Sequence, residues 1–188
     1  MKVPAFVFLM AAVLFAGAQN DSAAVINNSE DYYSAISLDS TLQHKEKGYE
    51  KLHDDITERG KLTCYYKHGK LVLLVNSSTD GVHCYEDVAY AVKGNKLVFV
   101  EDFRQCSFQT DEGSVESYTD ERNYFKNGKL RYLQSGIGPD EEGEIKYYTA
   151  PLEQDREQKI KAEFEFWKAF FLSPLSYADF EIGWNFKF

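Results

Sequence analysis

The sequence contains three cysteines, and their chemistry depends on which of them lie close together in the fold. Cys84 and Cys106 lie on either side of a predicted tight turn at Gly94-Asn95, so their separation depends on how the flanking segments pair. Two thiols that meet in an oxidising compartment form a disulfide, whereas isolated buried thiols stay reduced. Cys64 has no second cysteine at Cys-x-x-Cys spacing and no nearby histidine to activate it. We therefore interpret Cys64 as a buried strand thiol and not as a nucleophile.

The register of this hairpin decides whether the two cysteines meet. A strict two-residue turn places Asp87 opposite Asp102, and like charges opposite each other destabilise a sheet. One extra residue at the turn instead gives three favourable pairs: Cys84 with Cys106, Glu86 with Arg104, and Val92 with Val98. We favour the second register, which predicts a disulfide between Cys84 and Cys106. The alternative is three reduced, buried cysteines.

Acidic side chains on the same hairpin are the next candidates for chemistry. They are Glu86, Asp87, Glu101 and Asp102. Two carboxyl groups that flank a cleft can hydrolyse a glycosidic bond, one as the acid and the other as a base or nucleophile. The sequence does not indicate a cleft, and the favoured register gives Glu86 an arginine as its partner. We therefore predict no catalytic residue and keep a carboxylate-pair hydrolase as the alternative.

Two acidic turns, 111–113 and 140–144, contain the carboxylates from which calcium sites are built. Neither has the alternating ligand spacing of an EF-hand loop, and acidic turns in an acidic protein are usually just solvated. The sequence also lacks a nucleophile elbow, a glycine-rich phosphate loop and zinc-ligand spacing. We therefore predict no metal site and no cofactor.

A phrase that occurs three times determines the predicted architecture. Each copy has an aromatic or β-branched run, a lysine, two residues that tolerate positive φ, another lysine and a leucine. The copies are 65–71, 91–97 and 124–130. Their central pairs favour primed turns between antiparallel strands. We therefore predict a meander of strands at 62–67, 70–76, 82–92, 96–108, 115–125 and 129–134, with 144–149 as a candidate seventh.

Apolar spacing predicts the elements outside the hairpins. An apolar stripe after Asp39 predicts a helix of about sixteen residues that ends at Gly60. A second helix is predicted to begin at Pro151 and to end before Pro174. The tail 180–188 alternates apolar, mostly aromatic residues with other residues, which predicts a terminal strand. The predicted fold class is α+β: an antiparallel meander of six to eight strands with two amphipathic helices packed on one face.

The first eighteen residues have the pattern of a secretory signal peptide. Lys2 precedes an apolar run from Val3 to Phe15, and an Ala-x-Ala site follows it. The run is shorter than the roughly 20 residues of a membrane-spanning helix. We predict cleavage between Ala18 and Gln19, a mobile segment at 19–38 and a single α+β domain at 39–188. The predicted location is periplasmic or secreted, without stable membrane insertion.

The composition constrains the partners. The formal charge is −9, and removal of the leader with Lys2 makes it one unit more negative. An acidic chain is repelled by phosphate backbones, so nucleic acid is excluded as a partner. Thirteen tyrosines and fourteen phenylalanines lie mostly on predicted strands, with doublets that place one ring on each sheet face. We interpret these rings as packing, with a binding face for a protein or glycan as the alternative.

The phrases at 60–66, 90–104 and 121–133 resemble a family of small exported proteins from Bacteroidota-type bacteria. The resemblance covers roughly residues 38–134. It implies an exported protein of the same fold and supplies no activity and no site residues. The predicted function is an exported, non-enzymatic binding or interaction domain for an unknown protein or glycan of the cell envelope. The alternatives are an extracytoplasmic hydrolase with a carboxylate pair and a proteinaceous inhibitor module.

Overall fold

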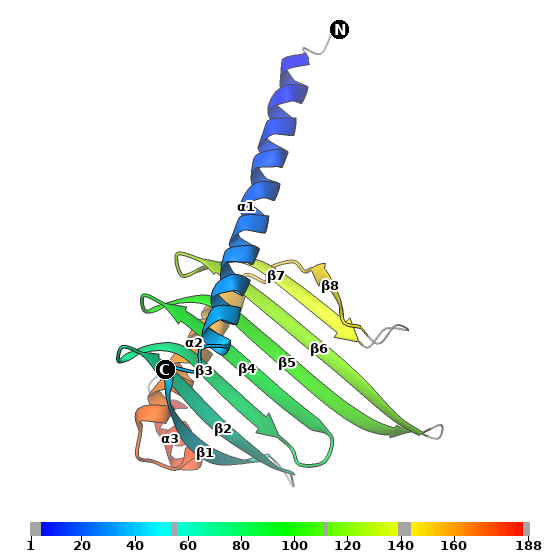
Figure 1. Ribbon diagram of the computed structural model, residues 1–188. Coiled ribbons are helices and arrows are strands. Elements are labelled where there is room, and N and C mark those ends of the chain that lie inside the picture. The colour runs from blue at the N-terminus through cyan, green and yellow to red at the C-terminus, as the bar shows by residue number, and fades with distance from the viewer. Residues whose placement is uncertain (1–4, 54–55, 111–112, 139–143, 186–188) are drawn as a thin grey trace.

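The computed structural model describes residues 5–53, 56–110, 113–138 and 144–185 (Figure 1). Within them, eight strands form one antiparallel sheet in sequence order: β1 (Gln43–His53), β2 (Ile56–Lys67), β3 (Lys70–Thr79), β4 (Cys84–Lys93), β5 (Lys96–Thr110), β6 (Gly113–Lys126), β7 (Lys129–Gly138) and β8 (Lys146–Thr149). Three helices accompany them: α1 (Ala5–Ser37), α2 (Arg156–Leu172) and α3 (Tyr177–Asn185). The predicted α+β meander is confirmed, and β8 is the candidate strand predicted at 144–149.

The three copies of the repeated phrase form the three turns at one end of the sheet (Figure 1). Both central residues of each turn have positive φ: His68-Gly69, Gly94-Asn95 and Asn127-Gly128. This is the backbone that a two-residue primed turn requires, and its twist matches the twist of the flanking strands. Glycine or asparagine at these positions therefore determines which strands become neighbours.

Each of these hairpins also contains a β-bulge shortly after its turn. The register shifts by one residue so that Val72, Val98 and Arg131 have no direct partner. In the middle hairpin this confirms the predicted pairing of Cys84 with Cys106. The extra residue lies in the strand and not in the turn, so Val92 pairs with Leu97 and the predicted Val92–Val98 pair is wrong. A bulge absorbs an extra residue without disturbing the tight turn.

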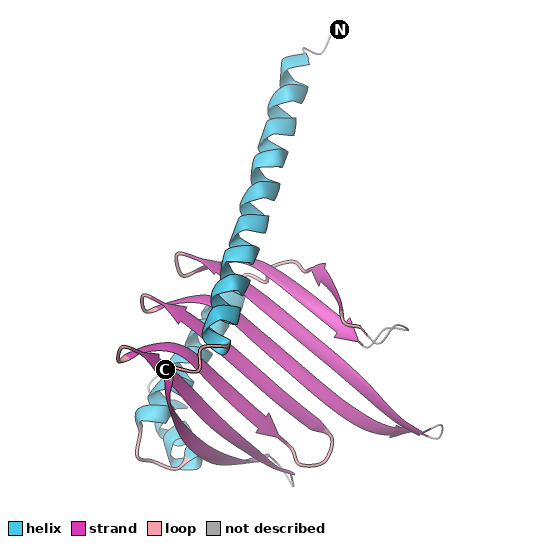
Figure 2. Ribbon diagram, in the orientation of Figure 1, coloured by secondary structure: helices cyan, strands magenta, loops and turns pink. Residues whose placement is uncertain are grey.

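Helices cover both faces of the sheet (Figure 2). The C-terminal half of α1 crosses one face and packs on Phe99 and Tyr124. On the other face, α2 and α3 pack on a larger apolar core that includes Leu74, Tyr90 and Val100. We call these two surfaces the α1 face and the α2 face. Two helices do pack on one face, but only α2 corresponds to a helix predicted from the sequence; α3 lies where a terminal strand was predicted, and α1 covers the opposite face.

The lysines of the repeated phrase attach the helices to the ends of the hairpins. On the α1 face, Lys67 pairs with Asp39 just after the helix, and Lys126 pairs with Asp21 in it. Lys93 lies over the ring of Tyr32 in α1, 5.1 Å from its centre. The second lysine of the last copy, Lys129, instead pairs with a glutamate of α2, at 3.5 Å. The repeated lysines thus have a structural role.

The helix predicted after Asp39 is wrong, because residues 43–53 form the edge strand β1. Leu52 and Ile56 of the predicted buried stripe are exposed. Tyr49 is buried, and Lys47 on the same face donates hydrogen bonds from its Nζ to the backbone carbonyls of Phe170 and Ser173 at the end of α2. Pairing with β2 and these contacts to α2 outweigh a weak helical pattern that contained a lysine and a glycine.

Gly60 ends no helix. It pairs with Tyr49 across β1 and β2, and the tyrosine ring lies directly over it: a Cβ at Gly60 would lie 2.1 Å from the ring. The ring in turn packs 5.1 Å from Trp167 and 5.2 Å from Tyr177, measured between ring centres. The absence of a side chain at Gly60 is therefore what allows β1 to join the core.

Replacement of Gly60 by alanine is expected to lower the free energy of unfolding by about 1–3 kcal/mol, because the Tyr49 ring must move out of the core. Urea denaturation followed by tryptophan fluorescence measures the change. The matched control is Gly48→Ala, where a Cβ would meet no atom nearer than 3.9 Å. Equal losses for the two variants would contradict this account of Gly60.

The predicted terminal strand at 180–188 is also wrong within the described residues, because 177–185 form α3. The same residues satisfy a helical spacing: Tyr177, Phe180 and Trp184 lie three and four positions apart and share one helix face. All three rings pack against Phe166 of α2, with ring centres 5.4–6.0 Å away. The sequence of this segment fits both the two-residue period of a strand and the three- to four-residue period of a helix. The contacts of its rings with α2 stabilise the helix. Residues 186–188 lie outside the described residues.

The N-terminal segment 19–38, for which the sequence predicted a mobile segment and no helix, is helical through Ser37. Val25, Ser29 and Ile36 are buried at steps of four and seven residues, a weak helical stripe that polar neighbours conceal. The helix also supplies Glu30 to a hydrogen bond with Tyr124. Ala18 and Gln19 lie in the same helix, and cleavage between them stays a prediction. The predicted second helix is confirmed as α2, although it begins at Arg156 and not at Pro151.

Candidate functional site

The four acidic residues singled out on the middle hairpin do not form one site. Because adjacent strand residues point to opposite faces, Glu86 and Asp102 lie on the α2 face. Asp87 and Glu101 lie on the α1 face. The hairpin therefore carries one acidic pair on each side of the sheet, and the two pairs have different surroundings.

The pair on the α2 face is crowded by other acids. Burial raises the pKa of Asp102 to about 7, and the charges of Glu86 and Glu163 add to the effect. Burial also raises the pKa of Glu86, while Arg104 opposite it acts in the other direction. A polar hollow of about 240 Å³ lies beside Glu86 and Arg104, and its lining does not include Asp102. The two acids of this pair therefore do not share this hollow.

The pair on the α1 face lies in a larger hollow of about 370 Å³, which we call the acidic hollow. Its ionisable and aromatic lining comes from α1 and from strands β4, β5, β6 and β8: Tyr33, Asp87, Glu101, Phe103, Asp120, Arg122 and Tyr147. The volume is in the range of small-ligand sites. This hollow combines an open volume with converging charged groups, so it is the candidate functional site.

Cross-strand pairing assembles one row of the acidic hollow. Asp87 pairs with Phe103, which pairs with Asp120 on the next strand. Asp120 pairs with Gly136, which pairs with Tyr147. A Cβ at Gly136 would lie 2.8 Å from the Tyr147 ring, so the missing side chain lets this ring lie across β7. The Tyr147 hydroxyl consequently reaches Asp120 and donates a hydrogen bond to its Oδ2.

Arg122 is the centre of charge in the hollow. Its guanidinium lies 3.0 Å from Asp120, 3.2 Å from Glu101 and 3.6 Å from Glu30 of α1. It also lies over the Tyr147 ring, 4.3 Å from the centre. Burial lowers the pKa of Arg122, but the carboxylates of Asp120 and Glu101 raise it by more. The arginine is therefore a permanent cation whose interactions are already made.

The carboxyl groups of the hollow are less completely satisfied. Burial raises the pKa of Glu101, and the neighbouring Asp120 raises it further while Arg122 opposes both. Asp120 has a side chain that is only 3% exposed. Its Oδ1 and the Oδ1 of Asp87 are buried and accept no hydrogen bond from any residue that the structure describes. Buried acceptors without partners are costly and uncommon, so each of them requires an explanation.

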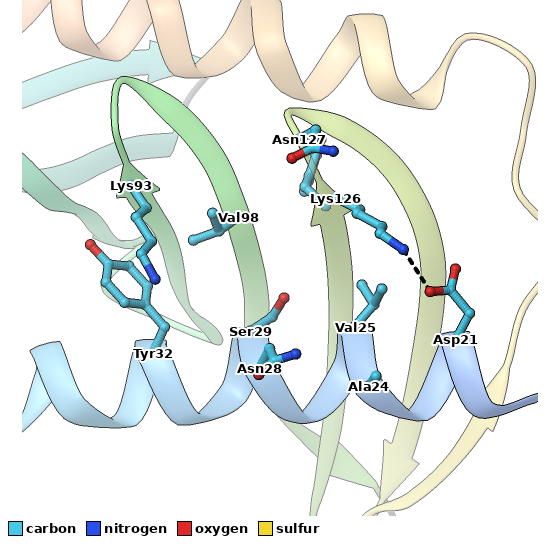
Figure 3. Close-up of a pocket in the computed structure, with 11 residues that line it drawn as sticks. Asp21, Ala24, Val25, Asn28, Ser29, Tyr32, Lys93, Val98, Lys126 and Asn127 are labelled. Carbon is cyan, nitrogen blue, oxygen red and sulfur yellow. Dashed lines mark hydrogen bonds and ion pairs between the residues drawn. The ribbon is translucent and has the colours of Figure 1, made fainter.

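A second hollow, of about 230 Å³, lies between α1 and the hairpin ends (Figure 3). Its charged groups already have partners: Lys126 pairs with Asp21 at 2.6 Å, and Lys93 lies over Tyr32. Ala24 and Val25 provide an apolar floor on the helix. We interpret this hollow as the place where the repeated phrase packs on α1.

The cysteines lie as predicted. Cys84 and Cys106 form a disulfide, and Cys64 is free and buried. Burial raises the pKa of Cys64 to about 11, which makes this thiol a poor nucleophile. The acidic turns considered for calcium fall largely at 111–112 and 139–143, outside the described residues. Among the described side chains, no three His, Cys, Asp or Glu are grouped so as to hold a metal ion.

No helix that the structure describes combines the length and the apolar character that crossing a membrane requires.

Comparison with protein-family models, with curated proteins and with solved structures found no match. The resemblance to exported Bacteroidota-type proteins therefore stays a prediction.

Most of the acidic hollow was missed by reasoning from the sequence. Asp87 and Glu101 were considered as acids, and Tyr147 only as one ring of an aromatic doublet; Asp120 and Arg122 were not considered. One signal was available in the predicted strand that contains Asp120 and Arg122. These two residues lie at every second position between Tyr118 and Tyr124, so they form a charged pair on a strand face that is otherwise aromatic. Tyr33 was noted only as one ring of an aromatic doublet, and Glu30 had no signal, because the segment that carries both was predicted to be mobile.

Proposed function

We propose that this protein is an extracytoplasmic, non-catalytic binding domain, and that its ligand lies in the acidic hollow on the α1 face. The single observation that carries the proposal is the pair of buried, unpartnered carboxylate oxygens of Asp87 and Asp120 at a hollow of about 370 Å³. A folded protein tolerates such acceptors where a ligand supplies the missing donors. The partner class is a protein or glycan of the cell envelope.

The compartment rests on two supports. The disulfide between Cys84 and Cys106 is typical of proteins from oxidising compartments. The pattern of the first eighteen residues is that of an export signal. Together they favour a periplasmic or secreted protein.

Binding is favoured over hydrolysis by the state of the acids in the hollow. Glu101 and Asp120 share Arg122, with Nε–oxygen distances of 3.2 and 3.0 Å. A glycosidase that uses a carboxylate pair needs one protonated and one ionised carboxyl group flanking the bond that breaks. Glu101 and Asp120 instead both contact the Nε of the same arginine, an arrangement that favours the ionised form of both acids and suits the binding of a ligand.

One observation favours the alternative of a hydrolase on the α2 face. The pKa of Asp102, raised to about 7, suits a general acid, and Glu86 is the second carboxyl group nearby. The pKa of Glu86 is raised as well, whereas the two acids of a glycosidase are driven apart by their environments. The hydrolase is therefore the second candidate.

The test is affinity capture of envelope proteins and glycans on the immobilised protein, beginning at Gln19, with two charge-reversal variants. Asp87→Lys places a cation in the hollow, and Glu50→Lys makes the same change at an exposed position of β1. We expect a ligand that the wild type and Glu50→Lys retain and that Asp87→Lys loses. Retention by Asp87→Lys would place the ligand elsewhere. Turnover of generic glycoside or ester substrates that Asp102→Asn abolishes would establish the hydrolase.

A further inference from the structure

We infer that the group held in the acidic hollow is a cation, an alkylammonium or a guanidinium. The inference rests on the proposed function for the location of the ligand and adds its chemical class. Three carboxyl groups line the site, from Asp87, Glu101 and Asp120, and Arg122 is the one guanidinium among the described lining residues. The lining therefore carries a formal excess of two negative charges, and Glu30, which pairs with Arg122 from α1, adds a further carboxyl group nearby. Such an excess in a partly buried site favours a positively charged ligand.

The hydrogen-bonding groups of the hollow support the same conclusion. The two oxygens without partners, on Asp87 and Asp120, can only accept hydrogen bonds while these groups are ionised. A ligand must therefore donate. Ammonium and guanidinium groups carry several N–H donors and no acceptor, and charge-assisted hydrogen bonds to carboxylates are about twice as strong as neutral ones.

An anionic ligand is disfavoured by the position of Arg122. This side chain is the only cation among the described lining residues, and three carboxylates within 3.6 Å already surround it. Its guanidinium face is covered by the Tyr147 ring. An incoming anion would have to displace these partners and then lie beside the three carboxyl groups of the lining.

The aromatic walls are suited to a cation as well. Tyr33, Phe103 and Tyr147 line the hollow from α1, β5 and β8. Aromatic faces attract ammonium and guanidinium groups, and more strongly when the contact is removed from water. The contact between Arg122 and Tyr147 shows that the fold already uses this interaction here. A volume of about 370 Å³ admits one flexible side chain or a linear amine and does not admit a folded domain.

The test is a titration of the purified protein that starts at Gln19. Calorimetry and the NMR signals of the tyrosine rings measure the binding. The probes are acetyl-arginine-amide, acetyl-lysine-amide and spermidine. The matched neutral probe is acetyl-citrulline-amide, which has the shape of the arginine probe without its charge. Sodium acetate serves as the anionic probe, and N-acetylglucosamine as the neutral sugar.

We expect at least one cationic probe to bind, at least tenfold more tightly than citrulline, and to weaken as salt is added. Asp87→Asn should weaken this binding at least tenfold, since it removes one charge and one acceptor. Glu165→Gln, an exposed position on α2, should leave it unchanged. Tighter binding of the amino-acid amides than of spermidine assigns the cation to a polypeptide side chain; the reverse assigns it to a free polyamine.

Equal binding of citrulline and arginine, or binding of acetate in preference to the cations, would overturn the inference. So would binding of N-acetylglucosamine alone, and the proposed function would then survive with a sugar as its ligand. An envelope ligand that Asp87→Lys still captures would instead overturn the proposed function itself. Thermal unfolding of Asp87→Asn identifies any loss caused by misfolding, and Tyr33→Leu, which removes one aromatic wall, then serves as a second variant of the hollow with the same expected direction.

Discussion

Replacement of Asp102 by asparagine is expected to raise the free energy of unfolding above pH 7, by up to about 4 kcal/mol. The carboxyl group is largely buried beside Glu86 and Glu163, and its pKa in the folded protein is raised from 3.8 to about 7. Ionised Asp102 is therefore unfavourable in the fold but not in the unfolded chain. Asparagine has nearly the same shape and carries no charge at any pH.

The sign of the pH dependence follows from proton binding. Between about pH 4 and pH 7 the folded protein holds a proton on Asp102 that the unfolded chain has released. Stability of the wild type should therefore fall as the pH rises through this window, and the full penalty should be present above it. Below about pH 4 the group is protonated in both states, so the variant and the wild type should be equally stable.

Urea denaturation across this pH range measures both effects. Asp31→Asn, at an exposed position of α1, is the matched control and should change little. A variant that is no more stable than the wild type above pH 7 would show that Asp102 carries no penalty. In that case its ionised form would have a partner, and the crowded acids of the α2 face would need another explanation.

Removal of the disulfide by the double substitution Cys84→Ala and Cys106→Ala is expected to cost about 3 kcal/mol. The bond closes a loop with a sequence separation of 22, and it restricts the unfolded chain accordingly. It also joins β4 to β5 close to Asp87 and Phe103, so the acidic hollow should loosen at the same time. Ligand binding should weaken together with stability.

Thiol titration provides the control for this experiment. The denatured, unreduced protein should contain one reactive thiol, that of Cys64, and its intact mass should be two daltons below that of the reduced chain. Three reactive thiols would contradict the disulfide. The double variant should match the stability of the wild type kept under reducing agent, because both lack the same bond.

The two acidic pairs of the middle hairpin lie on opposite faces of the sheet and have different surroundings. On the α2 face, burial raises the pKa of both Glu86 and Asp102, so their ionised forms burden the fold. On the α1 face, Asp87 and Glu101 border an open hollow, where their charges are available to a ligand. Strand alternation alone produces this division, since the two pairs occupy adjacent positions in the same two strands.

The sequence by itself determined the parts of this protein that are encoded locally. Gly69, Asn95 and Gly128 adopt the positive φ that primed turns need, so the hairpins, the order of the strands and the meander follow from short segments. The same local register brought Cys84 opposite Cys106. Charge repulsion between Asp87 and Asp102 was sufficient to choose it, even though the extra residue lies in a bulge and not in the turn.

Only the tertiary structure decided whether a segment is a helix or a strand where its sequence pattern is weak or fits both. Residues 43–53 are a strand because they pair with β2 and because Tyr49 rests on Gly60, and 177–185 are a helix because their rings meet Phe166. The acidic hollow needs Tyr33 from α1 and Tyr147 from β8, which are 114 positions apart in the sequence and meet only after the sheet forms. Local propensity amounts to less than about 1 kcal/mol per residue, so burial and long-range contacts determine such segments.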